Sequence, residues 1–257
     1  MLSTRATLAT LILAAGAMPL LAQDSTVKAS PKAASKWEFT IAPYVLFPTM
    51  QGTNAIGNFP AVSVNASASD IFSHLQGGAM LYFGMKKGDW AFATDVIYMK
   101  LGQDINPDSG FVSGSLTMKQ AAWEAFVFYQ FVPTLEVGLG GLGVKIDADA
   151  TVKLRPSATP AERSLSETWG LPVLAMRWTP WSTEHWTGLL FADFGGTGGN
   201  NWSYQVMPSV GYKFGKTFEL TLQYRYIALD YQTGSGADNF AYRMNIYGPQ
   251  IGFGFHF

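Results

Sequence analysis

The sequence predicts an all-β protein, a transmembrane antiparallel up-and-down β-barrel of about ten strands. Three observations predict it: long segments in which apolar and polar residues alternate, short connections that take turns with long ones, and an aromatic C-terminal segment. The composition agrees, because only 14% of the 257 residues are charged, against about 25% in an ordinary soluble domain.

The alternation has the two-residue period of a strand with two different faces. In segment 202–214, Trp, Tyr, Val and Phe occupy even positions, and Ser, Gln, Gly and Lys occupy most odd positions. Segment 218–226 repeats this pattern. Such runs of about ten residues exceed the ~5–6 residues of an average globular strand and suffice to cross a bilayer at a tilt. Aromatic residues at the ends of the apolar faces are typical of the girdles at membrane interfaces.

Short and long connections alternate along the chain, as they do in outer-membrane barrels. The expected strands lie near 37–47, 75–86, 89–101, 116–131, 135–149, 165–178, 186–195, 202–214, 217–230 and 240–257. Eight or twelve strands also fit, because residues 62–65, inside the long connection 48–74, alternate as well. Short turns belong on the periplasmic side, and an even strand count places both termini there.

Two glycine-containing places predict β-bulges, which re-aim a strand. Around 138–143 the outward-facing positions are expected to change from odd to even numbers. Up to Leu139 the odd-numbered apolar residues would face outward, and after the bulge Val144 and Ile146 would do so. A second bulge is expected at 247–249.

The chain divides into three parts. Residues 1–22 have the basic start, apolar stretch and small-residue end of a secretory signal peptide, 23–36 form a flexible periplasmic linker, and 37–257 form the barrel. After residue 22 no run reaches the ~18 apolar residues of a membrane-spanning helix. The expected location is therefore the bacterial outer membrane of a Gram-negative cell.

Composition excludes several functions. With 17 basic and 18 acidic residues, the chain lacks the basic face that nucleic-acid binding requires, so we expect no nucleic-acid partner. The absence of Cys excludes disulfides, thiolate metal sites and Cys nucleophiles. Since the sequence contains neither a metal-ligand cluster nor a phosphate-binding loop, we expect no cofactor and no metal.

Several short motifs resemble an outer-membrane-protein-like family of bacterial barrels, of the OmpA/OmpW-type superfamily, over about residues 40–257. They are Ala-Pro-Tyr at 42–44, Ser-Asp-Ile at 69–71, Lys-Gly-Asp-Trp at 87–90 with 95–101, Asp-Phe-Gly-Gly at 193–196, Gly-Tyr-Lys-Phe at 211–214, Tyr-Arg-Tyr at 224–226 and Gly-Pro-Gln-Ile-Gly at 248–252. The chain departs from the family at Leu46, where Trp is usual, and near His74, where an acid or amide is usual. The resemblance implies the barrel fold and the outer membrane, and no particular activity.

The C-terminal strand also resembles the insertion signal of such barrels, through Phe253, Phe255 and Phe257. We therefore expect the barrel assembly machinery and periplasmic chaperones as partners during biogenesis. In the membrane, the partners would be outer-membrane lipids and lipopolysaccharide, around a monomer.

Charged side chains occur on the faces expected to point inward: Glu38, Asp95, Glu124, Glu136, Lys145, Asp147, Asp193, Lys213, Glu219, Arg225 and Arg243. Because an unpaired charge is costly to bury, we expect a polar network in the lumen. Its expected members are Asp95, Glu124, Asp193, Arg225 and Arg243. Such a network indicates either a structural plug or a narrow passage for small solutes.

An enzyme is an alternative from another class, acting on lipid A or peptides. Its only candidate catalytic residues are Asp70, Ser73 and His74 in the first external loop, since barrel enzymes place acids, His and Ser at the outer rim. The other histidines do not suggest a site, because His185 lies in a short turn and His256 at the periplasmic end. A third hypothesis is a surface adhesin or receptor that acts through its external loops.

Overall fold

The computed structural model describes residues 36–105, 113–153 and 161–257. The expected signal peptide (1–22), and all of the expected linker (23–36) except Lys36, lie outside the described residues. Among the helices of the described ranges, none is long and apolar enough to cross a membrane.

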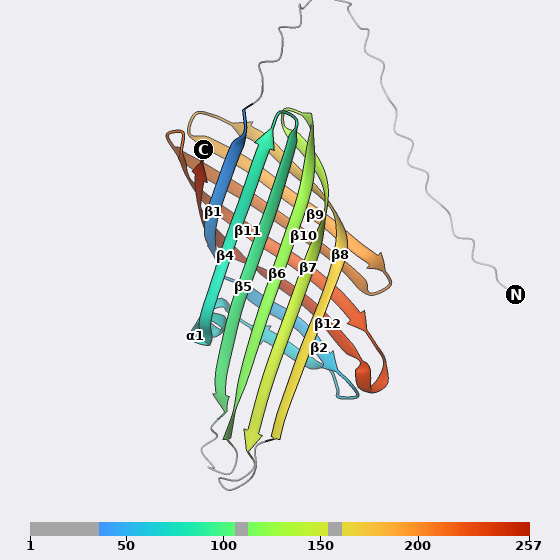
Figure 1. Ribbon diagram of the computed structural model, residues 1–257. Coiled ribbons are helices and arrows are strands. Elements are labelled where there is room, and N and C mark those ends of the chain that lie inside the picture. Colours follow the sequence, from blue (N-terminus) through green and yellow to red (C-terminus); the bar gives the residue numbers. More distant parts are fainter. Residues whose placement is uncertain (1–35, 106–112, 154–160) are drawn as a thin grey trace, which may run out of the picture. The chain divides into compact units, whose positions relative to one another are not determined.

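Ten antiparallel strands form a closed ring, which confirms the predicted fold (Figure 1). They follow one another around the ring in chain order, and the pairing of the first with the last closes it. The strands are β1 (Glu38–Leu46), β4 (Leu75–Lys87), β5 (Trp90–Ile105), β6 (Ser113–Val132), β7 (Leu135–Lys153), β8 (Ala161–Ser182), β9 (Trp186–Gly198), β10 (Asn201–Phe214), β11 (Phe218–Thr233) and β12 (Phe240–His256).

Two further strands lie outside the ring. After β1 the chain passes Pro48 and continues as β2 (Thr49–Ile56), which pairs with one half of β12 while β1 pairs with the other half. β3 (Val62–Ala66) pairs back onto β2, and the short helix α1 (Ala68–Ser73) leads into β4. The alternation at 62–65 is thus a strand, but not a member of the ring.

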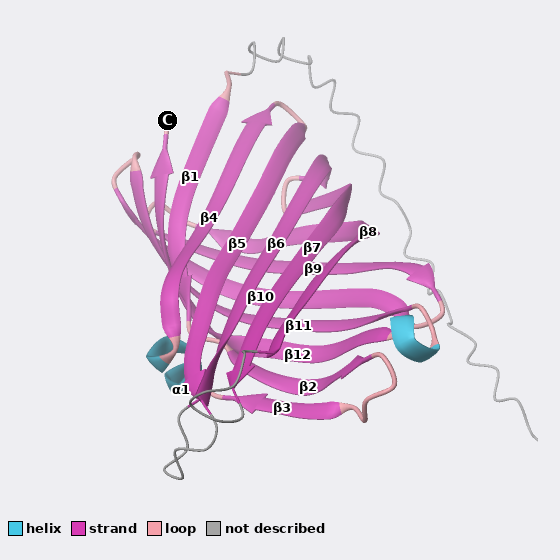
Figure 2. Ribbon diagram, turned by 60° about the horizontal axis from the view of Figure 1, so that its bottom comes forward, coloured by secondary structure: helices cyan, strands magenta, loops and turns pink. Residues whose placement is uncertain are grey.

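The two ends of the barrel differ. At one end, here called the short-turn end, lie the tight turns between strands, the start of β1 and the C-terminus (Figure 1). The opposite, loop end is extended mainly by β5 to β8, which have 16, 20, 19 and 22 residues (Figure 2). A short 3-10 helix, η1 (Gly236–Asp238), joins β11 to β12 at the loop end.

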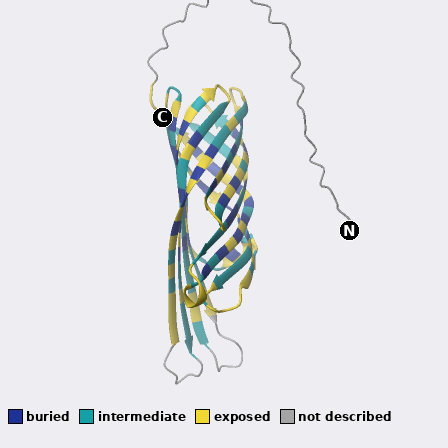
Figure 3. Cartoon of the chain, turned by 90° about the vertical axis from the view of Figure 1, so that its right-hand side faces the viewer, coloured by how far each residue is buried: buried dark blue, intermediate teal, exposed yellow. Residues whose placement is uncertain are grey.

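Exposed and buried residues alternate along the strands (Figure 3). Many outward side chains are large and apolar, and Leu139 is 71% exposed. We call this exposed set the apolar belt; it includes Trp90, Val96, Leu139, Trp178, Phe194, Phe214, Leu222 and Phe253. A closed ring leaves no unpaired sheet edge, and an apolar exterior around a closed ring is what hydrocarbon requires.

The two predicted bulges are wrong. The pairing of β7 with β8 runs without a register shift from Leu135 opposite Trp178 to Val152 opposite Ala161, and β11 and β12 pair continuously through Gly248 and Pro249. Accordingly, Val144 is only 2% exposed, inside the barrel.

The physical reason is a change in what surrounds the barrel. In the belt, lipid favours apolar residues on the outside, whereas beyond the belt water favours them on the inside. The apolar residues of one continuous strand therefore switch faces without a bulge. For the same reason Lys145, which was expected to point inward, points outward, and its side chain is 53% exposed. Its Nζ lies 3.3 Å from Asp147 Oδ2.

An apolar core consequently fills the barrel toward the loop end. Trp169 stacks on Tyr231, with ring centroids 4.5 Å apart and planes 6° apart. Ile71 of α1 and Met50 of β2 are buried in the same cluster, so α1 and the β2–β3 hairpin help to cover it. We call this cluster the loop-end core; its other members here include Met99, Leu142, Val144, Ile146, Leu171, Leu229, Tyr242, Met244 and Ile246.

Adjacent substitutions on β7 test the continuous register. We expect Val144→Asn to destabilise the barrel by about 1–3 kcal/mol, because it buries an amide without a partner. Lys145→Asn, its matched control, should change stability by less than about 0.5 kcal/mol. Urea unfolding in lipid vesicles measures both, and a costly Lys145→Asn beside a neutral Val144→Asn would restore the predicted bulge.

Candidate functional site

The candidate site is a polar network inside the barrel, centred on Arg225 of β11, which is only 2% exposed. Its Nη1 donates to Asp95 Oδ2 at 2.7 Å and to the Tyr44 hydroxyl at 3.0 Å. Its Nη2 donates to Glu124 Oε2 at 3.2 Å. One guanidinium therefore joins carboxylates from the neighbouring strands β5 and β6.

Gln205 of β10 extends this network to the other side. Its Oε1 accepts a hydrogen bond from Arg225 Nε at 2.5 Å, and its Nε2 donates to Asp193 Oδ2 at 2.9 Å. The Tyr44 hydroxyl also donates to Asp95 Oδ1 at 2.6 Å. We call these six residues, each on a different strand, the lumen plug: Tyr44, Asp95, Glu124, Asp193, Gln205 and Arg225.

Four of the five residues expected in a lumen network thus lie together, namely Asp95, Glu124, Asp193 and Arg225. Arg243 does not join them: its side chain is 52% exposed and pairs with Asp230 at 3.2 Å. The expectation of an inward Arg243 fails because β12 keeps its register through 247–249.

Sequence reasoning missed two members of the plug, Tyr44 and Gln205. Both were on the inward face of a recognised alternating segment. The alternation therefore indicated their inward position, but neither side chain carries a charge that would mark it in the sequence as a member of an ionic network.

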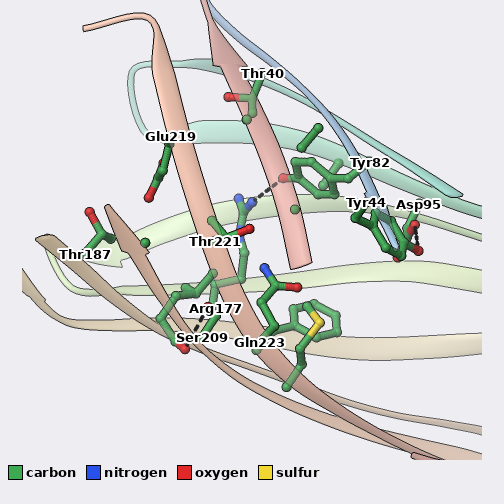
Figure 4. A pocket seen from close by; sticks show the side chains of 18 of the residues that line it. Thr40, Tyr44, Tyr82, Asp95, Arg177, Thr187, Ser209, Glu219, Thr221 and Gln223 are labelled. Carbon is green, nitrogen blue, oxygen red and sulfur yellow. Dashed lines mark hydrogen bonds between the residues drawn. The ribbon is translucent and has the colours of Figure 1, made fainter. Parts of the chain in front are cut away.

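The plug separates two unlike compartments. Toward the short-turn end lies a cavity of about 330 Å³, with aromatic, amide and hydroxyl side chains in its walls (Figure 4). Toward the loop end, the cavity beside Leu46, Ile97 and Leu142 measures only about 40 Å³, because the loop-end core fills that space. We call the larger one the lumen cavity.

Ion pairs surround the mouth of the lumen cavity. Glu136 binds Lys86 and Arg177, each at 2.7 Å, and Arg177 Nη1 also donates to the Tyr82 hydroxyl at 3.2 Å (Figure 4). Across the mouth, His256 Nε2 lies 3.0 Å from Glu219 Oε2. A wider vestibule of about 830 Å³ shares these residues and adjoins the cavity at the short-turn end.

The candidate catalytic residues lie on and just after α1, at the loop end. Ser73 Oγ is 3.0 Å from His74 Nδ1, but this nitrogen is also 2.7 Å from the backbone oxygen of Asp70. The Asp70 carboxylate instead accepts hydrogen bonds from the backbone and hydroxyl of Ser67, as an N-terminal capping box. These bonds lower the pKa of Asp70.

This arrangement is that of a helix cap. A catalytic acid would orient the imidazole, whereas the Asp70 carboxylate is engaged by Ser67. Within the described ranges, no three His, Asp or Glu side chains are grouped so that they could hold a metal ion.

Phe253, Phe255 and Phe257 lie exposed at the end of the chain, the first two on β12. Such a surface is available to lipid or to another protein. Their role as an insertion signal remains a prediction.

Known proteins resemble this chain in structure but not in sequence. No family model matches the chain, and no curated protein matches it in sequence. Among solved structures, the outer membrane protease OmpT of Escherichia coli matches with a TM-score of 0.55 at 7% identity, over 86% of this chain and 97% of that one. The fold is that of a bacterial outer-membrane β-barrel. Together with the apolar belt, it makes this chain an integral outer-membrane protein.

Weaker matches include Ail of Yersinia pestis, with a TM-score of 0.34 at 10% identity over 87% of this chain and 99% of that one. The toluene transporter TodX of P. putida has a TM-score of 0.33 at 8% identity, over 88% of this chain and 90% of that one. At these identities the likeness concerns the fold alone, so the role of this outer-membrane barrel must be argued from its own residues.

Arg225→Ala tests the plug. The change leaves the carboxylates of Asp95 and Glu124 buried without the guanidinium, which costs about 3–5 kcal/mol. We expect the folded form, seen as an anomalously migrating gel band, to convert to the unfolded form at a lower temperature than in the wild type.

Arg243→Ala is the matched control, because it removes an exposed ion pair worth about 0–1 kcal/mol. Its transition temperature should stay near that of the wild type. An unchanged transition in Arg225→Ala would contradict a structural role for the plug.

Proposed function

We propose that this outer-membrane barrel is a structural protein with a closed lumen. The observation that carries the proposal is the Arg225 network across the lumen, with the loop-end core directly beyond it. Small barrels are commonly filled by side chains. Here the filling has two layers of opposite character, one of charge pairs and one of packed apolar side chains.

The proposal includes an orientation and a set of partners. The short-turn end would face the periplasm and the loop end the exterior, as in barrels of known orientation. The monomer would contact outer-membrane lipids and lipopolysaccharide through its apolar belt. The barrel assembly machinery and chaperones would handle it during insertion, through the terminal Phe residues.

The lumen cavity favours a second candidate, a gated passage for small solutes. The cavity reaches from the vestibule to the plug, so half of a path exists already. Conduction would require movement of both the plug and the loop-end core, because the core leaves only about 40 Å³ of space beyond the plug. The closed barrel needs no such movement.

Planar-bilayer recording distinguishes these two functions. We expect no discrete conductance steps from the wild type, and none from Arg225→Ala, because the loop-end core still blocks the lumen when the plug is broken. Heat-dependent gel migration of the reconstituted protein verifies that it is folded. Reproducible steps from the folded wild type would overturn the closed barrel in favour of the passage.

A further inference from the structure

The lumen cavity has the properties of a small-molecule site. Its volume of about 330 Å³ lies at the lower end of the ~300–1,000 Å³ typical of ligand pockets. It adjoins the vestibule, with which it shares Glu136, Arg177, Glu219 and His256. The plug forms its floor, through Asp95, Glu124 and Gln205. A ligand would therefore enter from the short-turn end and stop at the plug.

The cavity has two unlike walls. Phe126 and Phe128 of β6 and Phe191 of β9 line one side, with the Phe126 ring 5.8 Å from Phe191 in an edge-to-face contact. β11 lies across the ten-strand ring from β6, and it contributes Thr221 and Gln223. A fitting ligand is therefore apolar on one flat face and polar around its edge.

Three polar atoms of the lining residues lack a hydrogen-bond partner among the described groups. They are Gln250 Oε1, Thr187 Oγ1 and Arg177 Nε, on β12, β9 and β8. The orientation of the Gln250 amide is fixed by its nitrogen, because Nε2 donates a hydrogen bond to Gln223 Oε1 at 2.7 Å and leaves Oε1 without a partner. Since these atoms come from three different strands, several hydroxyls around one ring match them better than a single polar group does.

Each acidic side chain in the cavity lining is already paired with a basic side chain. Asp95 and Glu124 pair with Arg225, Glu136 pairs with Lys86 and Arg177, and Glu219 contacts His256. A charged ligand would have to compete with these pairs, and separating a buried ion pair is costly. The cavity therefore favours an uncharged ligand.

We propose that the lumen cavity binds one uncharged monosaccharide ring. The C–H face of the ring packs on Phe126 and Phe191, and its hydroxyls bond to Gln250, Thr187 and Arg177. This site goes beyond the closed-barrel function and does not require conduction.

Saturation-transfer NMR on the intact barrel tests the proposal. The protein is held in an amine-oxide detergent, because the headgroup of a maltoside would compete. The probes are glucose, galactose, mannose and N-acetylglucosamine, with phenol as an uncharged aromatic of another class. We expect a saturable signal from at least one sugar, strongest for the C–H protons of one ring face.

Variants locate the bound sugar. Gln250→Leu and Thr187→Val should each weaken binding about tenfold, the effect of losing one hydrogen bond of ~1.4 kcal/mol. Thr187→Val keeps the side-chain shape, so it serves if Gln250→Leu fails to fold. Gln51→Leu, which removes an exposed amide on β2, is the matched control and should bind as the wild type does.

Three results would overturn the proposal. The first is no saturable signal from any of the four sugars. The second is a sugar signal that neither Gln250→Leu nor Thr187→Val weakens. The third is saturable binding of phenol with none of the sugars, which would assign the cavity to aromatic ligands. Bilayer recordings stay unaffected by these outcomes, so this site and the closed barrel can fail separately.

Discussion

The buried positive charge of Arg225 requires compensation, and this requirement determines which side chains occupy the middle of the barrel. A guanidinium that is 2% exposed must be matched by acceptors, or its burial would unfold the protein. Asp95 and Glu124 supply the charges, and Tyr44 and Gln205 supply further hydrogen bonds. Because these partners come from four other strands, the same contacts that satisfy the charge also tie the barrel wall together across its lumen. The plug thus compensates the buried charge and also connects opposite strands of the barrel.

The surroundings of the barrel determine what its interior contains. Within the apolar belt, lipid favours apolar side chains on the outside, and the lumen holds the plug and a cavity lined on one side by Phe126, Phe128 and Phe191. Beyond the belt, water surrounds the wall, and the apolar side chains turn inward and pack as the loop-end core. One protein therefore combines a membrane barrel with an interior closer to that of a soluble β-sandwich. The β2–β3 hairpin and α1 belong to this second part, since they contribute Met50, Val64 and Ile71 to the core.

Much of this could be predicted from the sequence. The two-residue period and the turns gave ten strands, and inward parity placed Asp95, Glu124 and Arg225 near one another. The prediction failed wherever it assumed that apolar residues face outward along the whole strand. That assumption introduced bulges at 138–143 and 247–249 and reversed Lys145, Asp147 and Arg243. The lumen cavity could not be predicted, because its walls depend on which residues of distant strands, such as Phe126 and Gln250, reach the same height.

A double-mutant cycle between Arg225 and Glu124 tests the central charge compensation most directly. The free energy of unfolding in vesicles would be measured for the wild type, Arg225→Met, Glu124→Gln and the double variant. If the guanidinium compensates this carboxylate, the second change will cost much less in the background of the first, with a coupling of about 1–3 kcal/mol. Effects that add to within about 0.5 kcal/mol would mean that the two groups are independent, and they would contradict the account.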